Sequence, residues 1–257
     1  MTEQEGESAS RGRLTALVAT AQRRWGTRVL RFGAETPTET ALLPTGIIAL
    51  DDVLGGLPRG ALTELLGAPT SGMTTLALTA IAHTQATGAL AAFIDVGGTF
   101  DSAYAAACGV DLSGLLLARP TSAPDVLELV EALVASGALS LLLVDSLAWL
   151  PGAPGGHALL STALRRITPV LARSPTALVA LTFLPYPAAV ASNLVGRGSP
   201  LAHAAALRLH VARGAWAVTQ GQAPGADAHV LVMKRRGAPD GAHFAVPVVF
   251  PSDWGTP

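Results

Sequence analysis

Hydrophobic residues recur along this chain with two different spacings, and from residue 61 onward the two spacings alternate. Short apolar runs bounded by Gly, Pro or Asp are typical of buried strands. Such runs occupy residues 61–67, 91–96, 114–119, 139–146 and 176–183. Longer segments with apolar residues every three or four positions predict helices. These segments occupy residues 74–88, 123–137 and 158–173.

The pattern changes in the last fifty residues, where apolar runs follow one another without helical segments between them. They occupy residues 206–214, 228–237 and 243–250. Strands separated by helices form parallel sheets, whereas consecutive strands pair in antiparallel fashion. The sequence therefore predicts an α/β fold with a twisted, mainly parallel sheet, helices on both faces and an antiparallel edge. Residues 46–60, rich in Gly and Pro, predict turns.

The polarity of the N-terminal region predicts three parts of the chain. Residues 1–12 are rich in Glu, Ser and Gly and predict a disordered tail. Residues 13–44 predict a helix over 14–26, a strand-like piece over 28–33 and a Pro-containing linker. Residues 45–257 then form the predicted core domain, with no internal repeat.

Composition favours a soluble cytoplasmic protein. Hydrophobic residues make up 50% of the chain and the mean hydropathy is +0.44. The most apolar run, residues 137–152, is nevertheless too short to span a membrane and carries Asp145 in its middle. The polar N-terminus resembles neither a secretory signal nor a transit peptide. Cys108 is the single cysteine, which excludes an internal disulfide and fits a reducing compartment.

The stretch GAPTSGMTT, residues 67–75, lies between a predicted strand and a predicted helix. A Gly-rich turn in that position forms a cradle of backbone N–H groups for phosphate. The phosphate site would comprise Gly67, Ser71, Gly72, Met73, Thr74 and Thr75. Thr74 offers the hydroxyl that would hold Mg²⁺, but Met73 stands where the phosphate-loop pattern has lysine. A chance Gly-rich turn before a helix is the alternative.

Asp145 is the second candidate for a phosphate site. It ends the apolar run LLLVDS, which places a carboxylate at the C-terminal edge of the predicted sheet. A lone Asp at a strand end is usually a turn residue. About 70 residues beyond the Gly-rich loop, it is better interpreted as a ligand for Mg²⁺. Binding of ATP and Mg²⁺ is therefore predicted to be weakened, and neither is required as a cofactor.

Several of these motifs occur in an order that identifies a family. The stretch from FGAETPTETALLPTGIIALDDVLGGLPRGALTELLGAPTSGMTT through AAFIDVGGTFDSAYAAACGVD to LLLVDSLAWL resembles the core of the RecA recombinase family. The resemblance covers roughly residues 14–248 and implies a RecA-type P-loop NTPase fold. In its size and in lacking the family's C-terminal domain, the chain resembles the RecA-related accessory proteins of SOS mutagenesis, the ImuA and SulA-like group.

This chain departs from the family at three positions that serve hydrolysis. Met73 replaces the phosphate lysine. Gly97 stands where the family has the Glu that polarises the attacking water. Leu184 and Pro185 occupy the neighbourhood of a Gln that senses the γ-phosphate. These three replacements favour a protein that does not hydrolyse ATP. Whether the protein is an enzyme stays open, and no catalytic residue is assigned.

The resemblance also predicts an interface between protomers. Lys234 and Arg236 match two family lysines that reach toward a neighbour's γ-phosphate, and Arg235 lies between them. A solvated basic strand end is the alternative interpretation. The family's N-terminal helix docks on the neighbouring protomer. The matching apolar stripe here consists of Leu14, Leu17 and Val18.

The family's two DNA loops are reduced in this chain. The first, residues 151–158, carries no Lys or Arg, and the second, residues 185–200, offers only Arg197. Single-strand grooves need cations along the backbone and aromatic platforms. Arg197, Tyr186 and His157 supply few of either, and a formal net charge of −1 adds no basic field. We expect only weak binding of single-stranded DNA.

Three functions follow from the resemblance. The first is a non-hydrolysing accessory protein in DNA repair, the SOS response and translesion synthesis, which acts by contact with a RecA filament or a repair polymerase and can form oligomers. The second is an ATP-dependent, single-stranded-DNA-binding recombinase paralogue. The third, more distant, is a SulA-type inhibitor of cell division. ATP turnover with single-stranded DNA separates the first two, and a division block on overexpression separates the third.

Overall fold

A computed structural model of the chain describes most of the core and parts of the N-terminal region. The described residues are 15–20, 23–24, 41–147, 155–184, 199–217, 225–237 and 239–249. The chain divides into two compact units, residues 1–40 and 41–257. In the first unit, residues 15–20 and 23–24 are helical, within the predicted helix 14–26.

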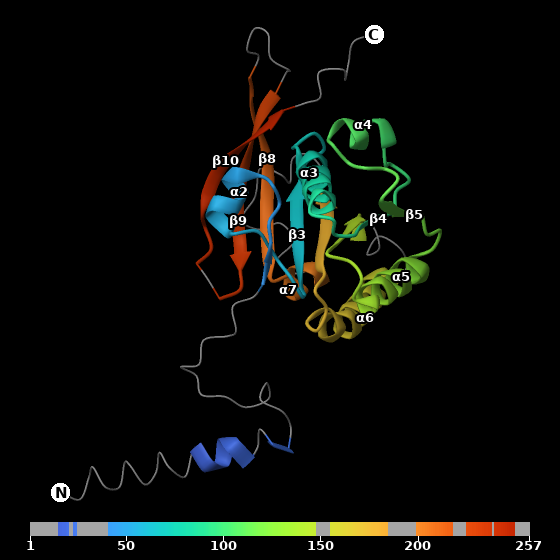
Figure 1. Cartoon of the computed structure of the whole chain (residues 1–257), viewed down its shortest axis with the longest axis vertical. Coiled ribbons are helices and arrows are strands. Elements are labelled where there is room, and N and C mark those ends of the chain that lie inside the picture. The colour runs from blue at the N-terminus through green and yellow to red at the C-terminus, as the bar shows by residue number, and fades with distance from the viewer. Residues whose placement is uncertain are drawn as a thin grey trace, which may run out of the picture. The chain divides into compact units, whose positions relative to one another are not determined.

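An eight-stranded sheet runs through the described part of the second unit, with strand order β10-β9-β8-β3-β7-β6-β4-β5 (Figure 1). Neighbours from β8 to β5 are parallel, whereas β8, β9 and β10 pair antiparallel. Its strands are β3 (Ala61–Gly67), β4 (Ala91–Asp95), β5 (Leu115–Ala118), β6 (Leu141–Asp145), β7 (Ala177–Phe183), β8 (Leu207–Ala217), β9 (Gly225–Arg235) and β10 (His243–Val249). A small antiparallel pair joins β1 (Leu42–Leu43) to β2 (Leu57–Pro58).

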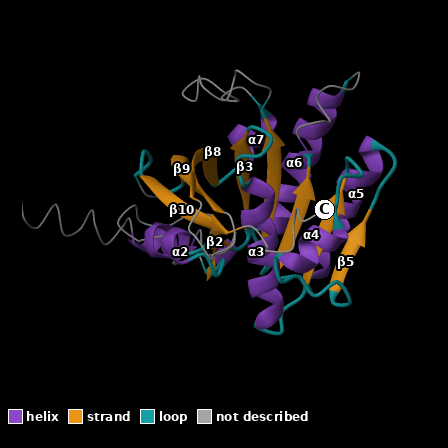
Figure 2. Cartoon of the chain, turned by 90° about the horizontal axis from the view of Figure 1, so that it is seen from above, coloured by secondary structure: helices purple, strands orange, loops and turns teal. Residues whose placement is uncertain are grey.

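Helices cover both faces of the sheet (Figure 2). They are α2 (Ile48–Leu54), α3 (Met73–Ala86), α4 (Ser102–Ala107), α5 (Ala123–Ser136), α6 (Gly156–Leu171) and α7 (Pro200–Ala204). One hydrophobic cluster joins α2 and α3 to alternate residues of the strands, and a second joins α5 and α6 to the residues between. The sheet is therefore buried on two sides, as parallel sheets require.

Local sequence signals set the helix ends. In α5, the side chain of Ser122 accepts a hydrogen bond from the N–H of Asp125, and Pro124 lies in the first turn. The helix ends at Gly137, whose left-handed backbone lets its N–H donate to the carbonyl of Val134. Both are ordinary helix start and stop signals of the sequence.

The structure confirms the predicted α/β fold, including the parallel sheet and its antiparallel edge. It corrects the interpretation of residues 46–60 as turns alone, because they contain α2. The side chain of Asp51 accepts hydrogen bonds from the N–H groups of Thr45 and Gly46 and so fixes the entry to that helix. Two short helices, α4 and α7, were not predicted. At six and five residues, each is too short to show a helical period.

Candidate functional site

The Gly-rich loop connects the end of β3 to the start of α3, and two of its glycines are required by its geometry. A Cβ on Gly67 would lie 2.4 Å from the carbonyl oxygen of Val211 and 2.7 Å from Oγ of Ser71. Gly72 has a φ of 95°, a backbone conformation that favours glycine. Thr70 also has a positive φ, of 66°. The loop is thus a close-packed turn at the N-terminus of a 14-residue helix.

A cavity of about 510 Å³ opens beside this loop. Loop residues, two carboxylates, four aromatic side chains and an arginine line it. They include Thr70, Ser71, Gly72, Met73, Thr74, Thr75, Phe93, Phe100, Asp101, Tyr104, Asp145, Phe183 and Arg213. The hydroxyl of Ser71 is buried and has no hydrogen-bond partner. A phosphate oxygen fits this position, because the unpartnered hydroxyl and the helix N-terminus would both stabilise its negative charge.

Two carboxylates lie side by side at the C-terminal edge of the sheet. Asp95 of β4 is paired in register with Asp145 of β6. Asp95 accepts hydrogen bonds from the N–H groups of Thr99 and Phe100 and from Nε of Arg119 at 2.9 Å. Asp145 lines the cavity, and burial, together with the charge of Asp95, raises its pKa to about 6. Of Asp95 and Asp145, it is therefore Asp145 that is available to a cation in the cavity.

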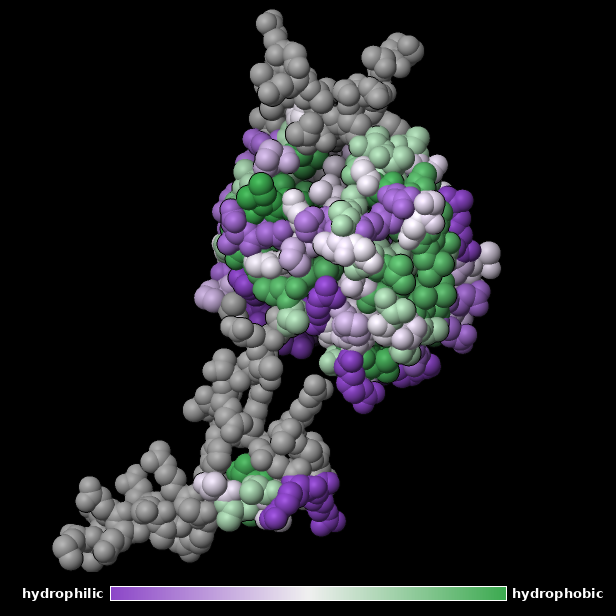
Figure 3. Space-filling view, viewed as in Figure 1, coloured by the Kyte–Doolittle hydropathy of each residue, from purple (hydrophilic) through white to green (hydrophobic). Residues whose placement is uncertain are grey.

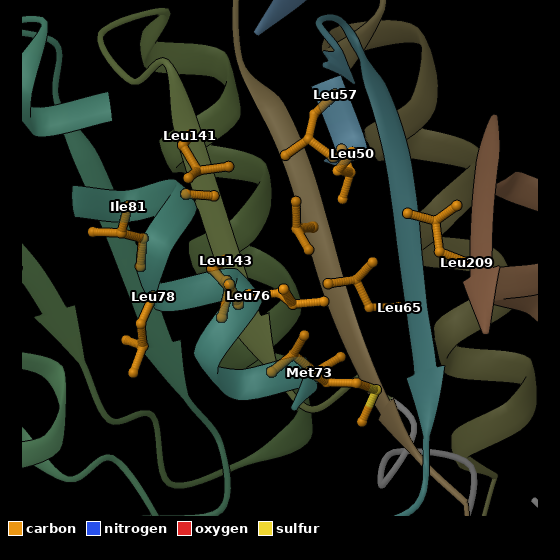
Figure 4. Close-up of a cluster of buried hydrophobic side chains, with 14 of the residues drawn as sticks. Leu50, Leu57, Leu65, Met73, Leu76, Leu78, Ile81, Leu141, Leu143 and Leu209 are labelled. Carbon is orange, nitrogen blue, oxygen red and sulfur yellow. The ribbon is translucent and has the colours of Figure 1, made fainter. Parts of the chain in front are cut away.

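Met73 belongs to the hydrophobic core as well as to the cavity wall. Its side chain is 1% exposed and packs in the cluster that contains Leu65 and Leu76 (Figure 4). Its sulfur lies 3.2 Å from the position of a Cβ on Gly67, so the side chain fills the base of the loop. The thioether can pack there, but it cannot neutralise a phosphate.

Aromatic side chains that were not predicted from the sequence line the cavity together with the loop. The rings of Phe93 and Phe100 meet edge to face, with centroids 4.9 Å apart. The hydroxyl of Tyr104 lies 2.7 Å from Oγ1 of Thr75, and Asp101 caps α4 by accepting a hydrogen bond from the N–H of Tyr104. A signal was available in the spacing of Asp101 and Tyr104, three residues apart at a helix start. Aromatic side chains that line a cavity can pack against a planar ring of a ligand.

Two other predicted nucleotide-site positions line the same cavity. Thr74 is half-buried in its wall, and Thr75 is buried. Gly97 follows β4 by two residues and offers no carboxylate. The N–H of Leu184, just after β7, donates to the carbonyl of Gly67 and ties that strand to the loop. The fold thus brings the loop, Asp145 and the three departures to one edge of the sheet.

The predicted interface residues have separate locations. Nζ of Lys234 donates to the carbonyl oxygens of Ala202 and His203 at the end of α7, and burial lowers its pKa. The Arg235 guanidinium donates to carbonyl oxygens at the end of α2, whereas Arg236 is exposed.

The N-terminal and DNA-loop predictions are only partly within the described residues. Leu17 is 63% exposed and Val18 is buried, and Leu14 lies outside the described residues. His157 is exposed in the first turn of α6. Tyr186 and Arg197 lie outside the described residues.

A mainly parallel sheet with a Gly-rich loop before α3 and an acidic strand end beside it defines a P-loop type of α/β domain. The sequence profile of the RecA N-terminal domain matches residues 13–252 of this chain. The chain therefore belongs to the RecA family.

Individual relatives support that assignment. The chain is 38% identical over 228 residues to Protein RecA of Frankia casuarinae, covering 82% of this chain and 66% of that protein. It is 43% identical over 165 residues to Protein RecA of Salinispora tropica, covering 59% of this chain and 47% of that protein. It is 37% identical over 229 residues to Protein RecA of Thermus thermophilus, covering 82% and 67%. The chain thus spans about half to two thirds of the length of these relatives. No helix within the described residues is long and apolar enough to cross a membrane.

Proposed function

We propose that this chain is a RecA-like assembly module of DNA repair that binds a nucleotide without hydrolysing it. In this proposal it acts in the SOS response by contact with an active RecA filament or a repair polymerase. One observation carries the proposal. The cavity keeps a phosphate-binding loop with an orphan hydroxyl at Ser71, while Met73 in its wall supplies no lysine and Gly97, two residues after β4, supplies no carboxylate.

The residues at the cavity fit a magnesium-bound nucleotide. Ser71 and the backbone N–H groups at the start of α3 would hold phosphate oxygens. Thr74 and Asp145 would contribute ligands to magnesium, which when bound would neutralise phosphate charge. Among the described residues, no group of three or more His, Cys, Asp or Glu could hold a metal ion. The ion would therefore take its remaining ligands from phosphate and water.

Binding without turnover follows from what the cavity lacks. Loss of one preorganised charge-stabilising group costs roughly 10²–10³ in rate. Here the lysine at 73 and the carboxylate at 97 are both replaced, and Leu184 is buried against the loop where the family's Gln is missing. We expect no ATP hydrolysis above background, with or without single-stranded DNA. Turnover stimulated by single-stranded DNA would instead support the recombinase paralogue, which the match to Protein RecA over 82% of the chain also favours.

Docking on another protomer has a candidate surface at β5. This strand is at the end of the sheet in the described residues, so one of its edges carries unpaired backbone groups. Leu116 is 50% exposed and Leu117 is 38% exposed. In Figure 3, hydrophobic surface gathers on the side of the molecule where β5 and α5 lie. An exposed apolar edge strand is suited to pair with an added strand from a partner.

The docking proposal is tested by co-precipitation of purified RecA with the full-length chain and with a version that lacks residues 1–33. We expect the truncated chain to lose most of the captured RecA, because the truncation removes the apolar stripe and the strand-like piece 28–33 that the sequence predicts. Arg236→Glu tests the basic end of β9 without removing Lys234 and Arg235, whose side chains bind α7 and α2. Exposed Arg173→Glu is its matched control. Equal capture by the full-length and truncated chains would show that the docking model is wrong.

A further inference from the structure

The strand β8 runs past the phosphate loop, and its alternation carries one side chain to the loop face. Leu207, Leu209 and Val211 are buried in the cluster that also contains α3. Val211 is paired in register with Gly67, the last residue of β3. Side chains two residues apart along a strand lie on the same face. Arg213 is therefore the next residue on that face, placed beside the Gly-rich loop rather than beside β3.

Contacts and charges agree with this placement. Nη1 of Arg213 lies 3.3 Å from Oγ1 of Thr70, and the side chain lines the cavity next to the loop. The cavity lining that the structure describes contains two carboxylates, Asp101 and Asp145, and one cation, which is Arg213. A nucleotide polyphosphate would bring further negative charge into the cavity. In the described lining, Arg213 is the one positive side chain that could neutralise this charge.

We propose that Arg213 supplies the positive charge that the loop lost at Met73, so that the cation of the phosphate site is on β8 instead of α3. This inference rests on the proposed nucleotide binding. The guanidinium is always charged and presents a planar set of donors that matches phosphate oxygens in a bidentate way. Thr70 is a positioning residue, because its hydroxyl holds the guanidinium over the loop. The ligand class is the di- or triphosphate group of a nucleotide.

Relocation of the charge also accounts for Met73. At 1% exposure, position 73 is part of the core, so an apolar side chain packs there without leaving a buried charge. The exposed Arg213 reaches the same cavity from solvent, where its charge needs little desolvation. The chain thus keeps a cation at the loop while its core becomes more apolar.

The test is calorimetry of the full-length protein with Mg·ADP, inorganic pyrophosphate and adenosine. Arg213→Ala should weaken ADP and pyrophosphate by about 10- to 100-fold, which is the loss of a charged hydrogen-bond pair. Adenosine affinity should not change. In the Arg213→Ala background, Met73→Lys should restore most of the lost affinity. This gain should be larger than the gain that Met73→Lys gives in the parent protein. Thr70→Val should give a smaller loss.

Controls separate this inference from the proposal it rests on. Arg173→Ala removes an exposed arginine next to the start of β7, at the opposite edge of the sheet, and should leave ADP affinity unchanged. Thermal unfolding should be the same for both arginine variants. If the parent protein binds ADP and Arg213→Ala binds it equally well, the Arg213 inference is wrong and nucleotide binding stands. If the parent protein binds neither ADP nor pyrophosphate, both proposals fail.

Discussion

Two neighbouring aspartates show how a few contacts decide the chemistry of a residue. Asp95 is surrounded by two backbone N–H groups and the Arg119 guanidinium, which together stabilise its charge. Asp145, one strand away in register, is buried beside that charge, and its pKa rises to about 6. The same residue type therefore has a structural role on β4 and remains available to a ligand on β6.

The raised pKa of Asp145 predicts a pH-dependent cost to folding. The folded pKa of about 6 exceeds the unfolded value of 3.8, so the folded state binds more protons between these values. Stability from this group is present at low pH and is lost as pH rises from about 4 to about 6. Asp145→Asn should therefore stabilise the protein by about 1–3 kcal/mol at pH 7.5, and by less as pH falls toward 4.

Urea unfolding of both proteins at pH 4.5 and pH 7.5 measures this difference. Exposed Asp240→Asn is the control, with no comparable pH-dependent gain expected. A gain from Asp145→Asn that is the same at both pH values would contradict the assigned cause.

Met73 carries the second prediction at this scale. Met73→Lys should bind Mg·ADP more tightly, because the lysine stem can replace the methionine side chain while the ammonium reaches the cavity. It should not hydrolyse ATP, since Gly97 still leaves the attacking water without a base. Calorimetry and phosphate release measure the two effects. Met73→Leu conserves the apolar volume and is the matched control. Hydrolysis by Met73→Lys alone would show that the missing carboxylate is supplied elsewhere.

At the scale of elements, β3 and β8 are joined by a buried charge pair as well as by their backbones. Glu64 and Arg208 are paired in register, with Nε of Arg208 at 2.6 Å from Oε2 of Glu64. Oε1 of Glu64 accepts from Thr182 of β7, so the carboxylate links three strands. Nη2 of Arg208 is buried without a partner. The pair is thus specific in geometry but incompletely satisfied.

Removal of one member of this pair should be far more costly than removal of both. Arg208→Met leaves Glu64 buried and uncompensated, at an expected cost of about 3–5 kcal/mol in the free energy of unfolding. The double variant Glu64→Leu with Arg208→Met should recover most of that loss, since apolar replacement of a buried pair is often close to neutral. Denaturant unfolding of the two single variants and the double variant measures the coupling. Additive losses would contradict it.

The elements that the sequence predicted well are those with strong, long patterns. Strand β6 is an apolar run that ends in Asp145, β3 is mostly apolar, and α5 carries both a cap and a terminal glycine. The α2 helix was missed because its seven residues lie among glycines that mark its ends. The Gly-rich loop and Asp145 were found from local motifs. Arg213 carries no such motif, because strand order in the sheet, not nearness in sequence, brings it to the loop, and the only local signal of the aromatic cavity lining is the spacing of Asp101 and Tyr104.

At the scale of the whole molecule, charge sets what the protein can do with nucleic acid. Seventeen basic and 18 acidic residues give a formal net charge of −1. Several basic side chains are committed within the chain, including Arg208 with Glu64, Arg119 with Asp95 and Lys234 with α7. These three side chains are less available to a phosphate backbone, and the chain has no net positive charge to attract one. If a partner already holds the DNA, this protein does not need to contact the DNA directly.

Binding of single-stranded DNA should therefore be weak, with a shallow salt dependence. One to three cationic contacts per protomer give a slope of about −0.7 to −2 in a plot of log K against log salt, at about −0.7 per phosphate neutralised. Fluorescence anisotropy with a labelled oligothymidine across several salt concentrations measures the slope. Arg197→Ala should flatten it by about 0.7 if that residue contacts a phosphate, whereas Arg173→Ala should leave it unchanged. A slope of about −4 or steeper would require a groove lined by several arginines, and direct DNA binding would then replace partner contact as the basis of function.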